Sequence, residues 1–426
     1  MISRKKEKTL GESAYKMEYI AGLKCVVCGA EYGFDMLYTC PKCGIEGILD
    51  LVYDYGKIKK TLTSKNLSHR HFSLWRYKEL LPVNADSILP ELAVGWTPIY
   101  SVPRLGEFLG INKLFLKDDG RNPTGSFKDR ASAIGVVKAQ EFKFNTIACA
   151  STGNAASSLA GFSAAVGLPS VIFVPERAPD PKVTQLLVFG AKVIKVKGSY
   201  DDAYYLCMDA CEKYGWYNRN CAINPYLIEG KKTAGLEIAE QMGNNIPDWI
   251  VFSVGDGCTI GGAWKGLKEM ALLGFTDGKR PKMLGVQASG SSPIAKAYHD
   301  GKPLLPVEAQ TKADSIAVGK PRNWRKAINA IRESGGSMVI VEDSKILDAI
   351  LYTARATGVF GEPAGATAVA GLKKAVADGI VKPEESALVV VTGNGLKDIK
   401  TAMEIVKPAD CILPKLENID ALLINK

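Results

Sequence analysis

From about residue 97 onward, short apolar runs alternate with longer, Ala-rich segments. The runs are rich in β-branched residues and predict strands at Lys113–Lys117, Thr146–Ala150, Ser170–Val174, Lys192–Val196, Trp249–Val254, Lys282–Gln287, Ser337–Val341 and Ala387–Val391. The segments between them predict helices, among them Asn154–Val166, Lys182–Phe189, Ile260–Leu272 and Ile346–Thr357. Several runs are apolar throughout, which is typical of strands buried on both faces. The alternation predicts an α/β fold in which helices cover both faces of parallel sheets.

The pattern divides the chain into four parts. With 426 residues we expect two to three domains. Residues 1–50 form an N-terminal segment with a cysteine-rich ribbon, and residues 51–96 read as helix and connection. Residues 97–405 are the α/β body, with two interleaved subdomains, and residues 406–426 are a C-terminal tail.

Three of the predicted strands end in polar, Gly-rich turns. These are Ser151-Thr152-Gly153-Asn154, Gly255–Gly262, and Thr392-Gly393-Asn394-Gly395-Leu396-Lys397. Open α/β sheets bind ligands outside the carboxyl ends of their strands. A single such turn is commonly only a turn. Three of them in one chain predict one shared site.

The turn Gly255-Asp256-Gly257-Cys258-Thr259 is suited to a phosphate group. Its glycines allow the backbone to approach a ligand closely, and the helix that follows adds unpaired N–H groups and a positive dipole end. It lacks the Gly-Lys-Ser/Thr ending of a Walker loop. We expect the Asp256 side chain to turn away, so that backbone amides bind the anion. The alternative is a plain strand-to-helix turn.

Lys128 lies in the segment Asn122–Arg130, where Pro123 and Gly125 predict a turn and an Ala-rich helix begins near Ser126. A lysine in the first turn of a helix feels the positive dipole end, and desolvation disfavours its charge. Both effects lower its pKa and make it a nucleophile toward aldehydes. The alternative is a solvated lysine paired with Asp129.

Four of the ten cysteines form two C-x-x-C pairs, Cys25 with Cys28 and Cys40 with Cys43. Each pair can place two thiolates on one tetrahedral cation, which predicts a small zinc ribbon. A ribbon that needs no metal, or a reversible disulfide pair, is the alternative. We expect the scattered cysteines to be small buried apolar residues; they are Cys149, Cys207, Cys211, Cys221, Cys258 and Cys411.

Composition narrows the class of function. The net charge of +9 comes without a long basic run interleaved with aromatics, so we expect a mildly basic surface and no nucleic-acid partner. Three histidines disfavour a Ser-His-Asp triad. No apolar run is long enough to cross a membrane, and the start of the chain lacks a secretory pattern. We therefore expect a cytoplasmic protein without a membrane partner.

Three motifs together resemble the threonine synthase family. They are Ser126-Phe127-Lys128-Asp129-Arg130, Ala150-Ser151-Thr152-Gly153-Asn154 and Val391-Thr392-Gly393-Asn394-Gly395. The resemblance spans about residues 70–405 and includes Gly361-Glu362-Pro363-Ala364-Gly365. It implies the fold of the fold-type-II enzymes that use pyridoxal 5′-phosphate (PLP), with two α/β subdomains. Some members carry an N-terminal ribbon with paired cysteines.

The resemblance also implies roles for individual residues. Lys128 would hold PLP as a Schiff base and move protons once substrate displaces it. Asn154 would bond the ring oxygen, the turn Ser151-Thr152-Gly153-Asn154 would receive the substrate carboxylate, and the turn from Gly255 to Thr259 would hold the cofactor phosphate. Thr392 would face the pyridine nitrogen. At family level we expect a homodimer acting on a small amino acid.

The chain departs from the family where a substrate phosphate is bound. A hydroxyl residue, an Asn-Ser pair and an arginine are usual there, whereas this chain has Ala155, Cys221-Ala222 and Leu227. Either the substrate lacks the phosphate, or other cations replace the arginine. The nearest candidates by motif are Lys117, Arg121, Lys231 and Lys232.

Three functions are compared. The first is threonine synthase, which eliminates phosphate from O-phosphohomoserine and adds water. The second is another PLP reaction, either an ammonia-lyase acting on threonine, serine or diaminopropionate, or a β-replacement enzyme such as a cysteate synthase. The third is a nucleic-acid-binding or regulatory protein with a degenerate enzyme domain, which the intact set Lys128, Asn154 and Thr392 disfavours. We adopt the first, although the residues of the substrate pocket favour the second.

Overall fold

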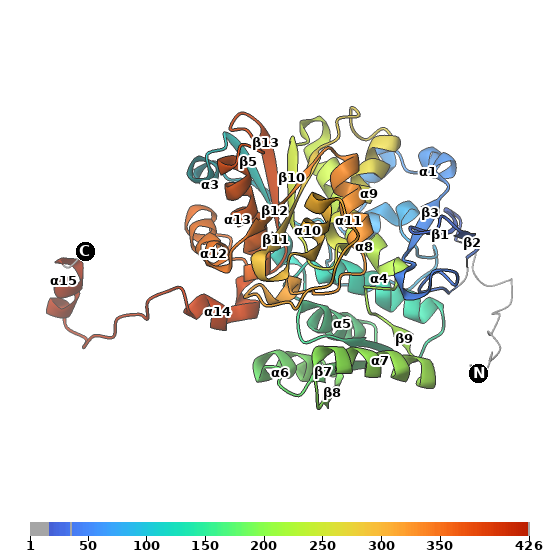
Figure 1. The fold of residues 1–426 in the computed structure, drawn as a ribbon, viewed down its shortest axis with the longest axis horizontal. Coiled ribbons are helices and arrows are strands. Elements are labelled where there is room, and N and C mark those ends of the chain that lie inside the picture. The colour runs from blue at the N-terminus through green and yellow to red at the C-terminus, as the bar shows by residue number, and fades with distance from the viewer. Residues whose placement is uncertain (1–16, 35, 425–426) are drawn as a thin grey trace.

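A computed structural model describes residues 17–34 and 36–424, and within them three sheets (Figure 1). Our expectation about the first residues of the chain therefore lies outside the described part. The largest sheet has the order β12-β11-β10-β13-β5-β4. Its strands are β12 (Ser337–Val341), β11 (Lys282–Ala288), β10 (Trp249–Ser253), β13 (Ser386–Val391), β5 (Lys113–Asp118) and β4 (Ile99–Ser101). All pairs are parallel except the edge pair of β4 with β5.

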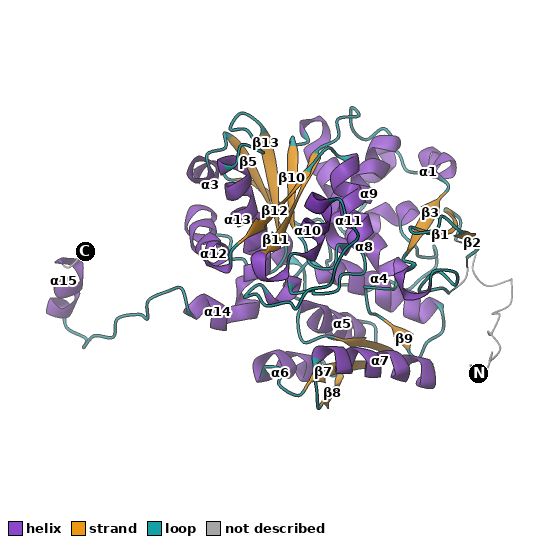
Figure 2. Ribbon diagram, in the orientation of Figure 1, coloured by secondary structure: helices purple, strands orange, loops and turns teal. Residues whose placement is uncertain are grey.

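Both faces of this sheet are buried, as the continuous apolar runs predict. In β10, Ile250 and Phe252 belong to one hydrophobic cluster, and Trp249 and Val251 to another. Helices lie on both sides of the sheet (Figure 2). One side has α8 (Pro225–Met242), α9 (Cys258–Leu272), α10 (Pro293–Asp300) and α11 (Trp324–Glu333); the other has α3 (Pro103–Leu109), α12 (Asp343–Thr357) and α13 (Pro363–Ala377).

The second sheet has four parallel strands in the order β8-β7-β6-β9. They are β8 (Lys192–Val196), β7 (Ser170–Pro175), β6 (Ile147–Ala150) and β9 (Tyr217–Asn218), accompanied by α4 (Lys128–Glu141), α5 (Asn154–Ala165), α6 (Asp180–Val188) and α7 (Tyr200–Tyr214). The chain thus contains two parallel α/β layers, as expected for the fold-type-II arrangement.

A small antiparallel sheet carries the paired cysteines. It consists of β2 (Glu31–Tyr32), β1 (Ile20–Cys25) and β3 (Leu49–Tyr53). The short helices α1 (Tyr55–Thr61) and α2 (Ser64–Ser68) follow in the connection. Because β3 runs to Tyr53, it crosses the boundary that we place at residue 50; the domain division itself stays a prediction.

The chain ends in α14 (Ile399–Met403) and α15 (Leu416–Ile424), and α15 lies well away from the body in Figure 1. Within the described residues, no helix is long and apolar enough to cross a membrane.

The predicted strands are all present, and the quoted helices begin and end within three residues of the expected positions. The two-residue strand β9 and the three-residue strand β4 were not predicted, because runs this short have no measurable periodicity.

Candidate active site

Lys128 is the first residue of α4 and follows a tight turn. Gly125 has a φ of 83°, a conformation that suits glycine. The Asp129 carboxylate accepts hydrogen bonds from the backbone and hydroxyl of Thr124. Asp129 is therefore occupied in shaping the turn, and the alternative of a solvated Lys128–Asp129 pair is not what the structure contains.

The surroundings of Lys128 favour its neutral amine. Burial is the main cause and the positive charge of Lys231 adds to it, so the pKa of Lys128 falls to about 8. Cys221, Cys258 and Glu362 act in the opposite direction. A lysine that loses its proton near neutral pH can attack an aldehyde, as the sequence predicts.

The three Gly-rich turns do meet around Lys128. The backbone N–H of Phe127 donates to the carbonyl of Thr392 at 2.9 Å, which ties the lysine turn to the end of β13. The Lys397 ammonium, beyond β13, donates to the Ser157 hydroxyl in α5 at 2.9 Å. The third turn, which begins at Gly255, contains Cys258. The Cys258 thiol raises the pKa of Lys128, against the effect of burial.

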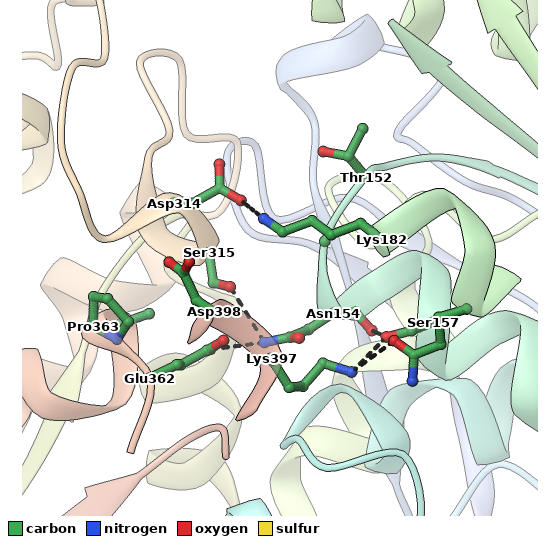
Figure 3. A pocket seen from close by; sticks show the side chains of 13 residues that line it. Thr152, Asn154, Ser157, Lys182, Asp314, Ser315, Glu362, Pro363, Lys397 and Asp398 are labelled. Carbon is green, nitrogen blue, oxygen red and sulfur yellow. Dashed lines mark hydrogen bonds and ion pairs between the residues drawn. The ribbon is translucent and has the colours of Figure 1, made fainter. Parts of the chain in front are cut away.

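Asn154 links the two α/β layers across the site. Its side-chain amide donates to Glu362 Oε1 at 2.7 Å and to the Ser315 hydroxyl at 3.2 Å (Figure 3). Burial raises the pKa of Glu362 above its usual value. Glu362 and Ser315 line the same pocket as Thr152, Gly153 and Asn154. Neither residue stands out in the sequence as part of a site, although Glu362 lies within the motif from Gly361 to Gly365.

The N-terminus of α5 has donors available for an anion. Its N-cap is Gly153, which offers no side-chain hydrogen bond to the first turn. Ser151, Thr152 and Gly153 are half-buried, whereas Asn154 is buried. Uncapped N–H groups and the helix dipole together attract a carboxylate or phosphate.

The turn after β10 likewise leaves backbone N–H groups available to an anion, at the N-terminus of α9. Gly257 has a φ of 97°, and a Cβ there would lie 2.6 Å from the carbonyl oxygen of Asn323. Only glycine fits this backbone. No side chain caps the helix, and Gly255 and Thr259 are partly accessible. The N–H groups of this first turn are suited to a phosphate group.

The carboxylate of Asp256 is engaged by the neighbouring loop. It accepts hydrogen bonds from the Arg322 backbone at 2.7 Å, the Asn323 amide at 2.8 Å and the Cys258 thiol at 2.9 Å. These contacts agree with the expectation that Asp256 shapes the turn without presenting its charge to an anion.

Two of the scattered cysteines, Cys221 and Cys258, act on the pKa of Lys128. Cys258 is buried as expected, whereas Cys221 is only half-buried, which corrects the expectation for that residue. The Sγ atoms of Cys221 and Cys258 are 3.8 Å apart. The Cys258 thiol and the nearby cations Lys231 and Arg219 hold the pKa of Cys221 well below its usual value. Cys411 is exposed; the other three are buried as expected.

Thr392 stands half-buried at the end of β13. Its carbonyl accepts from Phe127, whereas its hydroxyl makes no hydrogen bond within the described part of the chain. The hydroxyl is therefore available to a ligand.

The positions that depart from the family pattern offer no donor side chain. Ala155 and Ala222 are partly accessible, and Leu227 is buried against Gly135 in α4. Two of the candidate cations are already paired, which corrects the sequence-based proposal for them. Lys117 forms an ion pair with Glu237 at 3.0 Å, and Lys232 with Glu269 at 2.9 Å.

Of the other two candidates, Arg121 is exposed and Lys231 is buried near Lys128. Lys231 is therefore the one that the structure brings to the site.

The four ribbon cysteines come together. The Sγ atoms of Cys25, Cys28, Cys40 and Cys43 all lie within 4.8 Å of one another, and those of Cys28 and Cys40 are 3.7 Å apart. The N–H groups of Val27 and Cys28 point to the Cys25 sulfur at 3.4 and 3.5 Å. Four sulfurs bound tetrahedrally to zinc at about 2.3 Å would be about 3.8 Å apart, so this set fits the metal.

Comparisons with known proteins agree with this site. Residues 90–393 match the family described as pyridoxal-phosphate dependent enzyme. A threonine synthase of Methanosarcina acetivorans is 43% identical over 95% of this chain and 99% of its own length. A threonine synthase of Methanocaldococcus jannaschii is 40% identical over 89% and 94% of the two chains.

Solved structures share the fold. A threonine deaminase of Solanum lycopersicum aligns with a TM-score of 0.63 at 23% identity, over 73% of this chain and 88% of its own. Diaminopropionate ammonia lyase of Escherichia coli aligns with a TM-score of 0.62 at 19% identity, over 73% and 87%. The family match covers most of the chain, and the relatives match over nearly their full length. The chain therefore belongs to the pyridoxal-phosphate dependent enzymes, as a lyase of the threonine synthase family.

Proposed function

We propose that this enzyme eliminates phosphate from O-phosphohomoserine and adds water to give threonine. The observation that carries the proposal is the full-length similarity to proteins named threonine synthase, in a chain whose reactive lysine lies where three Gly-rich turns meet.

The residues present fit pyridoxal phosphate. Lys128 would bind its aldehyde carbon, and the turn from Gly255 to Thr259, at the uncapped N-terminus of α9, would bind its phosphate. The Thr392 hydroxyl would face the ring nitrogen. Asn154 would bond the ring oxygen with the amide that Glu362 and Ser315 now hold. When bound, the cofactor supplies an electron sink that acidifies the hydrogens on the substrate's Cα and Cβ.

The chain's own groups then have separate tasks. The α5 N-terminus, with Ser151, Thr152 and Gly153, would bind the substrate carboxylate through unpaired N–H groups. Lys128, released from its covalent role, would move the protons, because its pKa near 8 allows it both to accept and to return one. Glu362, whose pKa burial raises, is placed to hold Asn154 in position.

The test is turnover on a panel of O-phosphohomoserine, threonine, serine, diaminopropionate and O-phosphoserine. We expect phosphate and threonine in equal amounts from the first compound. The second candidate, an ammonia-lyase, is favoured by the absence of donor side chains at Ala155, Ala222 and Leu227. Ammonia and a ketoacid from threonine or serine, without phosphate release from O-phosphohomoserine, would replace the first function by the second.

We also propose that the ribbon binds one zinc ion. Its four sulfurs form a closed set, which leaves no position open for substrate, so the metal would have a structural role.

A further inference from the structure

Buried cations around the active site are nearly all matched by carboxylates. Arg130 pairs with Asp119 at 2.7 Å and also with Glu237. Lys117 and Lys232 are paired as described above. This matching is expected, because a buried charge without a partner is strongly disfavoured.

Arg219 and Lys231 are exceptions. They are 2% and 3% exposed, and among the described residues neither has a carboxylate at ion-pair distance. Arg219 donates from Nη2 to the Ser132 hydroxyl at 2.9 Å, and its Nε has no partner. Burial lowers the pKa of Lys231, but the neighbouring thiols of Cys221 and Cys258 overcome this effect and raise it above its usual value. Both cations are thus held in the interior by neutral or weakly anionic groups.

Both cations act electrostatically on one partly accessible residue, Cys221. The positive charges of Lys231 and Arg219 both lower the pKa of the Cys221 thiol. Cys221 and Ala222 are only half-buried. The positive charge of Lys231 also lowers the pKa of Lys128. A ligand that reaches Cys221 and Ala222 would therefore lie beside both cations and near the reactive lysine.

Arg219 also stands next to Leu227. Measured from the position that a Cβ on Gly135 would occupy, Leu227 Cδ2 lies at 3.0 Å and Arg219 Cγ at 3.8 Å. The two side chains share one space beside α4. The Arg219 side chain therefore runs beside Leu227, from a position that directly follows β9 and lies eight residues earlier in the chain.

We propose that Arg219 and Lys231 bind the distal phosphate of the substrate, and so restore the anion site that Ala155, Ala222 and Leu227 leave without donors. The proposal rests on the proposed function for the identity of the substrate. A phosphate monoester carries up to two negative charges and several acceptor oxygens, which match a guanidinium with a free N–H and an ammonium. The cofactor's own phosphate has a separate place at the α9 N-terminus.

The test is to titrate the holoenzyme with inorganic phosphate and to measure the binding of phosphate by calorimetry. With the cofactor bound, its own phosphate occupies the α9 N-terminus, and the part of the added phosphate binding that depends on Arg219 and Lys231 reports on the distal site. We expect Lys231→Met and Arg219→Met each to weaken phosphate binding by about 10- to 100-fold, the range for one charge-assisted hydrogen bond. The Lys231→Arg variant should retain most of the wild-type affinity for phosphate. Arg121→Gln, which removes an exposed cation, is the matched control and should bind as the wild type does.

Kinetics on O-phosphohomoserine give a second measurement. Both Met variants should raise KM more than they lower kcat, and inorganic phosphate should compete less well. If Arg219→Met fails to fold, Arg219→Lys should fold and show an intermediate loss.

Three outcomes separate the proposals. Phosphate binding that depends on both cations in an enzyme that does not turn over O-phosphohomoserine supports the anion site and rejects the proposed function. Unchanged phosphate binding in both Met variants overturns the anion site. The anion site is also overturned if the Met variants lose PLP on dialysis while their binding of phosphate is unchanged. The two cations would then bind the phosphate of the cofactor.

Discussion

Lys128 shows how a single residue acquires its chemistry from its neighbours. An exposed lysine has a pKa of about 10.4 and is a poor nucleophile at neutral pH. Here burial, with the charge of Lys231, lowers the pKa to about 8. Glu362 limits the fall without forming an ion pair. The amine is therefore reactive near neutral pH and can still return a proton.

The first prediction concerns the attachment of PLP. Lys128→Ala should abolish the visible absorbance of lysine-bound PLP, because Lys128 begins the helix that follows the turn tied to the end of β13, and its pKa favours the neutral amine. Borohydride reduction of the wild type, followed by peptide mapping, should place the label on Lys128. A stable label on Lys231 or Lys397 would show that the assignment is wrong.

The second prediction concerns pH. Only the neutral amine attacks the aldehyde, so the rate at which the apoenzyme attaches PLP should rise with pH through about 8. Lys231→Met removes a positive neighbour, which favours the protonated form of Lys128 and raises its pKa. The midpoint should therefore move to higher pH in the variant. Stopped-flow absorbance measures it, and a midpoint that stays or falls would contradict the electrostatic argument.

At the scale of elements, a buried ionic cluster fixes the helix that carries Lys128. Arg130, in the first turn of α4, binds Asp119 after β5 and Glu237 in α8. Lys117 in β5 completes the cluster through Glu237. All four side chains are 0% exposed. The cluster therefore ties α4, which accompanies the second sheet, to the layer of the large sheet.

The third prediction tests this cluster. Glu237→Gln leaves Arg130 and Lys117 short of one negative charge and should lower the free energy of unfolding by about 3–5 kcal/mol. Asp378→Asn breaks the exposed pair with Lys374 and should change it by less than about 1 kcal/mol. Urea denaturation measures both. Equal effects would mean that the buried cluster contributes no more than a surface pair.

The same carboxyl gives a pH dependence with a defined sign. Burial raises the pKa of Glu237, but Arg130 and Lys117 overcome this and hold it at about 2. Its contribution is therefore complete above the unfolded value of about 4.3 and is lost as the pH falls toward 2. Glu237→Gln should have a smaller acid dependence than the wild type over that range.

Elements and turns could be predicted from the sequence because their signals are local. Buried parallel strands read as continuous apolar runs, and parallel strands place their carboxyl ends at one edge, so the turns at Ser151, Gly255 and Thr392 pointed to a common site. The hydrogen-bond partners of the site residues could not be predicted, because they lie far apart in the sequence. Asn154 and Glu362 are 208 positions apart.

The candidate cations illustrate the same limit. Lys117, Lys231 and Lys232 look alike in the sequence, and only the folded chain shows which of them has a buried carboxylate beside it. Arg219 had no motif to mark it, because its role depends on sharing space with Leu227.

At the scale of the whole molecule, the ribbon and the connection that follows it are joined to the catalytic body by buried and partly buried polar contacts. Tyr53 donates to Glu229 in α8 at 2.9 Å, and Tyr55 to Glu269 in α9 at 3.0 Å. Lys326 in α11 donates to the carbonyl of Leu49 at 2.9 Å. The ribbon thus contacts the helices whose N-termini and neighbours form the site, although its cysteines take no part in it.

The fourth prediction follows from this arrangement. Metal analysis of the purified enzyme should give one zinc per chain, and the Cys40→Ser, Cys43→Ser double variant should have none. Four thiols close together gain much of their order from the metal, so its loss should lower the thermal midpoint by several degrees.

PLP absorbance at 25 °C should persist in the double variant, because Lys128 and the turns that surround it belong to the α/β body. Cys207→Ser, at a buried thiol outside both sites, is the control for thiol loss alone. Zinc absent from carefully prepared wild type would reject the metal site. Loss of the cofactor together with zinc would show instead that the contacts of Tyr53 and Tyr55 transmit order from the ribbon to α8 and α9, and through them to the turn at the α9 N-terminus.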